Sequence, residues 1–172
     1  MLDIEIDETP APREFPAELA LRLASNKAVA GAAHPGCGPR DVVLAADTIV
    51  VLDGRPLGKP RDREDGLAML AGLSGRSHEV LTAVALVAAG RLASRLSRSR
   101  VTFRRTTSAE RERYWASGEP LDKAGGYAVQ GLGAVLVERL EGSYSGVMGL
   151  PLFETAELLR AAGIDTWQEV GS

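Results

Sequence analysis

The sequence predicts an α/β fold with a mixed, twisted sheet flanked by helices. Two observations carry this prediction: apolar runs of strand length alternate along the chain with amphipathic stretches, and those stretches begin at helix caps. The chain has 172 residues, of which 45% are hydrophobic and 25% charged, as in a globular domain that buries a core without disulfides. We expect one domain over residues 1–172.

The first elements are expected to be a strand, a helix and a hairpin. Residues 2–6 alternate apolar and charged side chains, which favours a short strand. Pro16 suits the first position of a helix that runs to about residue 33, and residues 34–39 form a loop. The apolar run 42–52 is a buried strand, and Asp53-Gly54 is typical of a type I′ turn into a second strand.

A helix and a second hairpin are expected next. Asp62 can cap a helix whose leucines recur on one side, and Gly75 ends it. Residues 79–87 alternate as a strand, residues 88–90 turn, and residues 92–105 return as a long partner strand.

The last third of the chain is expected to add two helices and one strand. Thr107 and Glu110 form a capping box for a helix through Trp115. A strand over 134–140 follows a polar segment, and Pro151 opens a final amphipathic helix that Gly163 ends.

Charge and cysteine content exclude several classes of protein. The net charge of −3 gives no basic surface for a nucleic acid polymer. Cys37 is the single cysteine, so there is no disulfide framework, and neither a signal peptide nor a membrane-spanning run is apparent. We therefore expect a cytoplasmic protein with neither nucleic acid polymer nor membrane as partner. His78 is expected to be structural.

Asp47 is a carboxylate in the middle of the buried apolar strand. Leaving it ionised there without a cation or hydrogen-bond donors costs several kcal/mol, so we expect it to face a cleft holding a lysine, a metal or a ligand. If Asp53 and Gly54 are the two turn residues, the strand pairing places Lys59 opposite Thr48 and beside Asp47. The alternative is a plain hairpin in which Asp47 caps a turn.

Lysine is rare in this chain: Lys27, Lys59 and Lys123 are the only lysines among 20 basic residues. Each could mark a place where a compact ammonium is needed and a planar guanidinium does not fit, although chance is the alternative. Paired glycines at 125–126 beside Lys123 let backbone amides approach a phosphate, and the Gln130 amide could read the edge of a base. A structural loop is the plainer interpretation.

Four ordered motifs resemble the Maf nucleotide pyrophosphatases. They are Leu44 to Val50 with Lys59-Pro60, Leu73-Ser74-Gly75 with His78 to Thr82, Asp122 to Gly125, and Gly142-Ser143-Tyr144 with Gly149-Leu150-Pro151. The resemblance covers nearly the whole chain. It implies a Maf/ITPase-like fold with two lobes around a nucleotide cleft, and a house-cleaning hydrolase that converts a nucleoside triphosphate to its monophosphate and diphosphate with a divalent cation, Mg²⁺ or Mn²⁺.

The resemblance assigns roles at five positions first. Asp47 matches the family's proton acceptor and a metal contact, and Lys59 and Lys123 match lysines that face the phosphates. Thr48 and Gln130 match positions tied to substrate choice. Gln130, with the Gly-Gly-Tyr before it, is similar to the branch that acts on dTTP and UTP, or on modified pyrimidine nucleotides.

Two further assignments lie toward the start of the chain. Lys27 matches a family lysine, although Asn26 stands where an acidic residue is usual, and Glu8 resembles part of an acidic pair that contacts metal or water. Family members begin with a strand, a Ser-x-Ser-Pro-Arg-Arg loop and a helix, so Met1 stands about thirty residues into their pattern. We expect the first strand and helix to be missing, and with them two arginines that grip phosphate.

Two functions are therefore open at this point. The first is a pyrophosphatase acting on dTTP and UTP. The alternative is a catalytically impaired nucleotide-binding or cell-division regulatory protein, which would bind nucleotide without releasing diphosphate. The resemblance also allows a homodimer.

Overall fold

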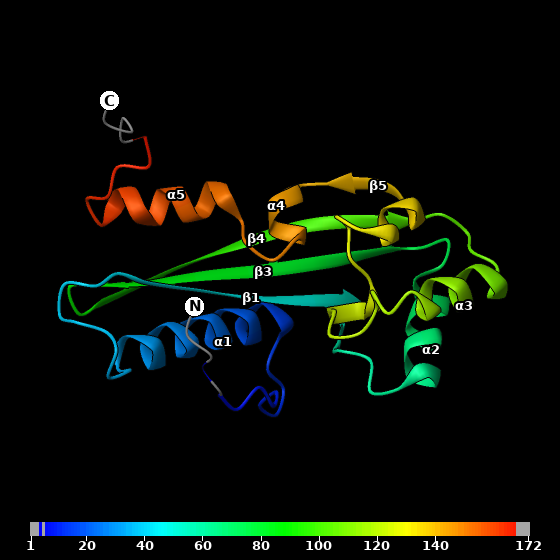
Figure 1. Cartoon of the computed structure of the whole chain (residues 1–172), viewed down its shortest axis with the longest axis horizontal. Helices are drawn as coiled ribbons and strands as arrows, with labels where there is room; N and C mark the ends of the chain where they lie inside the picture. The colour runs from blue at the N-terminus through cyan, green and yellow to red at the C-terminus, as the bar shows by residue number, and fades with distance from the viewer. Residues whose placement is uncertain (1–3, 5, 168–172) are drawn as a thin grey trace.

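The computed structural model describes residue 4 and residues 6–167. Its strands form one sheet in the order β2-β1-β3-β4-β5, with α1 along one face and α4 and α5 along the other (Figure 1). The helices are α1 (Pro16–Ala32), α2 (Arg63–Leu73), α3 (Ser108–Ala116), α4 (Tyr144–Val147) and α5 (Leu152–Ala161), with 3₁₀ turns η1 (Ala124–Gly126) and η2 (Leu132–Leu136). The strands are β1 (Val43–Leu52), β2 (Arg55–Leu57), β3 (Ser77–Ala88), β4 (Arg91–Phe103) and β5 (Val137–Glu141).

The α/β class is confirmed, and the sheet differs in one respect from the expectation. Every strand pair in the described part of the chain is antiparallel, where a mixed sheet was expected. The strand expected over 2–6 lies largely outside the described residues, and Ile4 and Ile6 belong to no strand. No helix within residues 6–167 combines the length and apolarity needed to cross a membrane.

The hairpin of β1 and β2 has the predicted turn. Asp53 and Gly54 have φ values of 52° and 75°, as a type I′ turn requires, and Leu52 pairs with Arg55 as expected. The pairing stops at Leu57, however, so the extrapolated position of Lys59 opposite Thr48 is wrong. Residues 43–49 of β1 therefore pair only with β3 within the described chain, and their other edge faces the candidate site.

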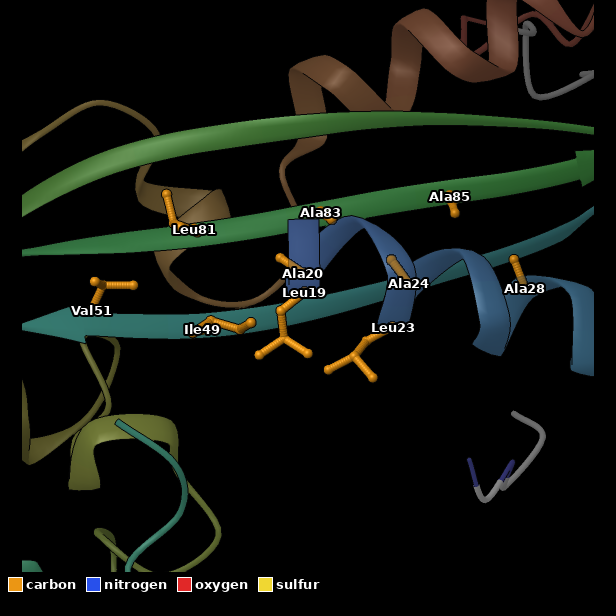
Figure 2. Packing of buried hydrophobic residues seen from close by; sticks show 10 residues of the cluster. All are labelled: Leu19, Ala20, Leu23, Ala24, Ala28, Ile49, Val51, Leu81, Ala83 and Ala85. Carbon is orange, nitrogen blue, oxygen red and sulfur yellow. The ribbon is translucent and has the colours of Figure 1, made fainter. Parts of the chain in front are cut away.

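Helix α1 covers one face of the sheet through small and branched apolar side chains. Figure 2 shows Leu19, Ala20, Leu23, Ala24 and Ala28 of α1 against Ile49 and Val51 of β1 and Leu81, Ala83 and Ala85 of β3. Burying each leucine stabilises the fold by about 1.5 to 3 kcal/mol. Because residues four apart share a helix face, the row Leu19, Leu23, Lys27 directs Lys27 toward β1.

The opposite face holds a second core. Val50, Val80 and Val101 of the sheet pack with leucines of α2 and with Tyr114, Tyr127 and Phe103. His78 is buried there, and its Nε2 forms a 2.8 Å hydrogen bond with the Tyr127 hydroxyl. The rings of His78 and Tyr127 both pack edge to face against Phe103. This environment agrees with the structural role expected for His78.

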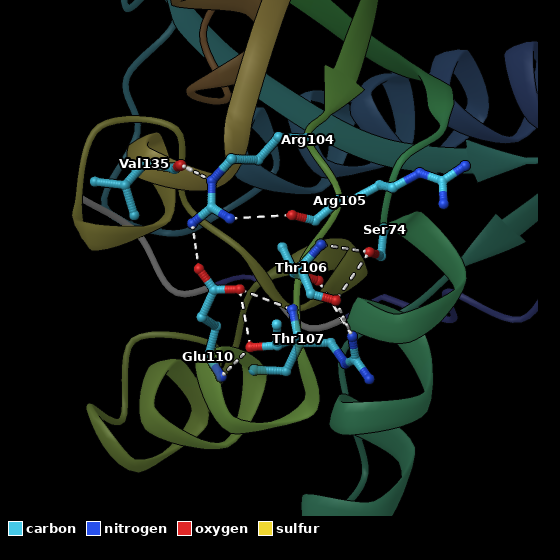
Figure 3. Close-up of polar contacts among 8 residues, drawn as sticks. Ser74, Arg104, Arg105, Thr106, Thr107, Glu110 and Val135 are labelled. Carbon is cyan, nitrogen blue, oxygen red and sulfur yellow. Dashed lines mark hydrogen bonds and ion pairs between the residues drawn. The ribbon is translucent and has the colours of Figure 1, made fainter.

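A polar junction fixes the end of β4 to the start of α3 (Figure 3). The predicted capping box is present, because Glu110 N donates to Thr107 Oγ1 while Thr107 N donates to Glu110 Oε2. Arg104 joins it with a 2.9 Å ion pair to Glu110 and a hydrogen bond to the Val135 carbonyl. The backbone hydrogen bond from Thr107 and then the Arg104 contact lower the pKa of Glu110 to about 2. The junction therefore anchors the segment that follows η1.

The main differences from the expected elements lie in the last third of the chain. Residues 132–136 form η2, so the strand expected over 134–140 is wrong at its start and runs from Val137 to Glu141. The short helix α4 was not predicted, and Ser143 caps it by accepting a hydrogen bond from Gly146 N. Pro151 is the N-cap of α5 and not its first helical residue.

Candidate functional site

One cavity of about 480 Å³ opens along the free edge of β1. This volume lies in the range of small-molecule sites. Side chains reach it from the segment before α1, from α1 and β1, from the loop after β2, and from the polar segment around η1. Its lining includes all seven residues that the sequence nominated: Glu8, Lys27, Asp47, Thr48, Lys59, Lys123 and Gln130.

Asp47 and Glu8 converge on the ammonium of Lys27. Lys27 Nζ lies 2.6 Å from Asp47 Oδ1 and 2.7 Å from Glu8 Oε1. Strand β1 places Asp47 on the face that α1 covers, and the helical row described above brings Lys27 over it. The partner of Asp47 is therefore Lys27, and the expectation of Lys59 as its direct partner is wrong.

Burial sets the acidity of this cluster. Asp47 is 12% exposed, and desolvation raises its pKa, although the hydrogen bond and charge of Lys27 oppose the rise. Glu8 is 55% exposed, and its hydrogen bond to Lys27 lowers its pKa. Desolvation opposes the charge on Lys27, but its two carboxylate partners raise its pKa overall, so it stays an ammonium at neutral pH.

Lys59 and Lys123 line the cavity from two loops that are fastened together. Gly125 N donates a 3.0 Å hydrogen bond to the carbonyl of Gly58, which precedes Lys59. Gly125 has a φ of 69°, and a Cβ there would press on Val50 at 3.0 Å, so this contact requires glycine. The pairing of the loops brings two lysines that are far apart in sequence to one cavity.

Gln130 lies at the exposed rim of the cavity, on a segment that Glu119 organises. Glu119 accepts hydrogen bonds from Leu132 N at 2.7 Å and Gly133 N at 2.8 Å, and from the Tyr114 hydroxyl at 2.8 Å. Burial opposes the charge on Glu119, but these donors lower its pKa overall. The carboxylate therefore works as an internal cap for the backbone after Gln130, while the Tyr114 hydroxyl accepts a hydrogen bond from Ala128 N before it.

Comparison with known proteins identifies the family. A family model described as "Maf-like protein" matches residues 1–162. This chain belongs to the Maf family. Three curated proteins similar to it are each named "dTTP/UTP pyrophosphatase". The one from Alkalilimnicola ehrlichii is 58% identical over 95% of this chain and 82% of its own length, that from Bordetella avium 56% over 92% and 80%, and that from Saccharophagus degradans 50% over 99% and 81%.

The cavity of this Maf protein has lining residues that sequence reasoning gave no role. Asp122 precedes Lys123 and adopts a φ of 62°, and Tyr127 and Met148 complete the wall. Asp122 belongs to the motif from Asp122 to Gly125, so the sequence could have indicated it as a site residue. Its left-handed backbone could not be predicted from the sequence. Met148 follows the unpredicted helix α4 and had no local signal.

Asp47 and Glu8 are the residues of the Maf cavity that could hold a divalent cation. Asp47 and Glu8 already converge on one cation, the Lys27 ammonium, from two separate segments. Mg²⁺ is commonly held by one or two carboxylates together with substrate phosphates. Within residues 6–167 no group of three or more His, Cys, Asp or Glu side chains could hold a metal.

Proposed function

We propose that this protein hydrolyses dTTP and UTP, releasing the nucleoside monophosphate and diphosphate. The observation that carries this proposal is the convergence of Asp47, Glu8 and all three lysines of the chain on one cavity. Nothing in the local sequence requires three lysines from α1, the loop after β2 and the segment before η1 to meet. The names of the similar Maf proteins agree with this chemistry.

The ammonium groups supply most of the electrostatic stabilisation in the proposed mechanism. Lys59 and Lys123 would contact the triphosphate, because neither forms an ion pair in the described part of the chain. As water attacks the α-phosphorus and the bond to the β-phosphate oxygen breaks, negative charge grows on the departing diphosphate. Fixed positive charges aimed at that oxygen stabilise the transition state more than the bound substrate.

Asp47 is the proposed proton acceptor. Its Oδ1 is held by Lys27, while the described residues give Oδ2 no hydrogen-bond partner, so this oxygen is free to take a proton from water. Burial raises the pKa of Asp47, which makes it a better base than an exposed aspartate. Lys27 fixes the orientation of the carboxylate. A Mg²⁺ or Mn²⁺ ion held by Asp47 and Glu8 would act as a Lewis acid on phosphate oxygens.

Diphosphate release from dTTP, UTP, CTP and GTP with Mg²⁺ or Mn²⁺ tests the proposal. Asp47→Asn is expected to lower turnover about 10²- to 10⁴-fold while the fold is kept. Asp53→Asn is the matched control, because Asp53 is 65% exposed in the hairpin turn and asparagine suits its left-handed backbone. Normal turnover by Asp47→Asn would overturn the assignment of the base. Nucleotide binding without diphosphate release by the unmodified protein would favour the regulatory alternative.

The proposal also includes the cofactor, the location and the assembly expected from the sequence. We propose Mg²⁺ or Mn²⁺ as cofactor, the cytoplasm as location and a homodimer as the assembly. Removal of the cation with a chelator should abolish diphosphate release, and re-addition should restore it. Sedimentation velocity at two protein concentrations checks the dimer.

A further inference from the structure

A short chain of hydroxyl groups leads from the cavity wall into the sheet. Thr82, in β3, is 1% exposed, and its Oγ1 lies 2.7 Å from the carbonyl oxygen of Gly146 in α4. The same Oγ1 lies 3.0 Å from Oγ1 of Thr48, its direct partner across β1 and β3. Thr48 lines the cavity, whereas Thr82 does not.

The proton in each of these contacts can be placed by counting. A carbonyl oxygen only accepts hydrogen bonds, so the single hydroxyl proton of Thr82 must go to Gly146. Thr82 therefore has no proton left for Thr48, and Thr48 must donate its own proton to Thr82. The described residues offer Thr48 Oγ1 no other hydrogen bond. The Thr48 hydroxyl can therefore only accept a hydrogen bond from a molecule bound in the cavity.

The surroundings of Thr48 suit an uncharged ring. Successive residues of a strand point to opposite faces, so Thr48 lies on the other side of β1 from Asp47 and Lys27. Val147, Met148 and Gly149 line the same cavity, and a Cβ on Gly149 would lie 3.7 Å from Thr48 Oγ1. The cluster of Asp47, Glu8 and Lys27 thus lies on one side of β1, and Thr48 lies on the other side beside Gly149.

We infer that Thr82 is a positioning residue that fixes Thr48 as an acceptor for the ring N3–H of uracil and thymine. Uracil and thymine carry a hydrogen on N3, whereas N3 of cytosine carries none and can only accept. An acceptor facing this atom pairs with UTP and is left opposite a second acceptor in CTP. The inference rests on the proposed function, because it assumes that a pyrimidine nucleotide occupies the cavity.

The hydrogen bond from Thr82 to the Gly146 carbonyl also holds α4 in place. A control must therefore separate the loss of this contact with α4 from the change in the orientation of the Thr48 proton. Ser99 supplies the control, because its Oγ accepts a 2.9 Å hydrogen bond from Ser143 N at the cap of the same helix. Ser99 is 5% exposed and does not line the cavity. Ser99→Ala therefore loosens α4 without changing what Thr48 donates to.

The test measures the ratio of dissociation constants for UTP and CTP by calorimetry, beside diphosphate release from the same two nucleotides. In Thr82→Val the Thr48 proton loses its acceptor and the hydroxyl can turn to donate, so the preference for UTP over CTP should fall about tenfold. Thr82→Ser should restore it, and Ser99→Ala should keep it. Thr48→Val, which removes the acceptor itself, should lose the preference and provides a second variant.

The outcomes separate this inference from the proposed function. An equal change for both nucleotides in Thr82→Val, which a sugar contact or a displaced helix would give, overturns the inference. An equal loss of preference in Ser99→Ala, or an unchanged ratio in Thr82→Val, also overturns it. The ratio of dissociation constants measures binding and not hydrolysis. A protein that binds UTP selectively but releases no diphosphate would therefore refute the proposed hydrolysis, while the UTP to CTP ratio of Thr82→Val would still decide the role of Thr82. Failure to bind either nucleotide overturns both.

Discussion

Replacing Lys27 with methionine gives the sharpest test of the charge cluster. Methionine keeps most of the length of the Lys27 side chain and suits a helix, but leaves Asp47 and Glu8 without their shared cation. Removing one partner of a fully buried ion pair costs about 3 to 5 kcal/mol, because the other charge stays buried and unpaired. Here Lys27 is 23% exposed and Glu8 55%, so water screens part of the loss, and about 1 to 3 kcal/mol is expected near pH 7.5.

The loss should depend on pH in a defined direction. The folded protein raises the pKa of Asp47 above its ordinary 3.8, so the stability tied to this group is present below that pH and falls as pH rises. Without Lys27 the pKa of Asp47 rises further, so the ionised Asp47 destabilises the fold more at neutral pH. Lys27 also lowers the pKa of Glu8 below its ordinary 4.5, and the stability this gives above that pH is lost in the variant. Both effects make the difference between the two proteins small near pH 3.5 and full at pH 7.5.

Urea unfolding at pH 7.5 and at pH 3.5 measures both effects. A loss of about 1 to 3 kcal/mol corresponds to a midpoint lowered by about 0.5 to 1.5 M urea, with an unchanged m-value. Lys59→Met is the matched control, because Lys59 is exposed and forms no ion pair in the described part of the chain, so its midpoint should change little. Equal stability of Lys27→Met and the unmodified protein at pH 7.5, or an equal loss at both pH values, would refute the reasoning.

Two further predictions concern the core. Burial lowers the pKa of His78 from 6.5 to about 4, so its protonation destabilises the fold as pH falls through that window, by on the order of 3 kcal/mol. His78→Phe should remove this slope from acid unfolding curves and cost about 1 to 3 kcal/mol at pH 7.5 through the unpaired Tyr127 hydroxyl; an unchanged slope would contradict it. In α2, Gly66→Ala should cost about 1 to 3 kcal/mol because its Cβ would overlap the Trp115 ring. Gly72→Ala in the same helix has room and should be neutral or stabilising by up to about 1 kcal/mol in thermal melts, and equal losses at both positions would show that the ring moves aside.

Local sequence was sufficient where the cause of a structure lies within a few residues. The Asp53-Gly54 turn needs two positive φ angles, and the two residues themselves allow them. The Asp62 cap and the box of Thr107 and Glu110 are contacts between residues three apart. These elements formed as predicted. The start of β5 was missed because η2 depends on Arg104, which directly follows β4 and donates hydrogen bonds to the carbonyls of Leu136 and Val135.

The chemistry of the site divides in the same way. The sequence by itself determined the groups available: a carboxylate in an apolar strand, three lysines, and motifs that resemble the Maf family. Extrapolating the strand pairing from the hairpin turn gave Lys59 as the partner of Asp47. Strand pairing was the one contact between separate segments that could be extrapolated from the local sequence.

Tertiary structure decided which of these groups touch. The packing of α1 across β1 brings Lys27 to Asp47, and neither residue signals that contact in its own segment. The acceptor character of Thr48 likewise depends on Thr82 in the neighbouring strand and on a carbonyl in α4. The sequence gives the chemical group at each position, and local propensity gives the helix or strand that carries it. The distance between two groups, and the direction of a shared proton, follow only from how the helices and strands pack.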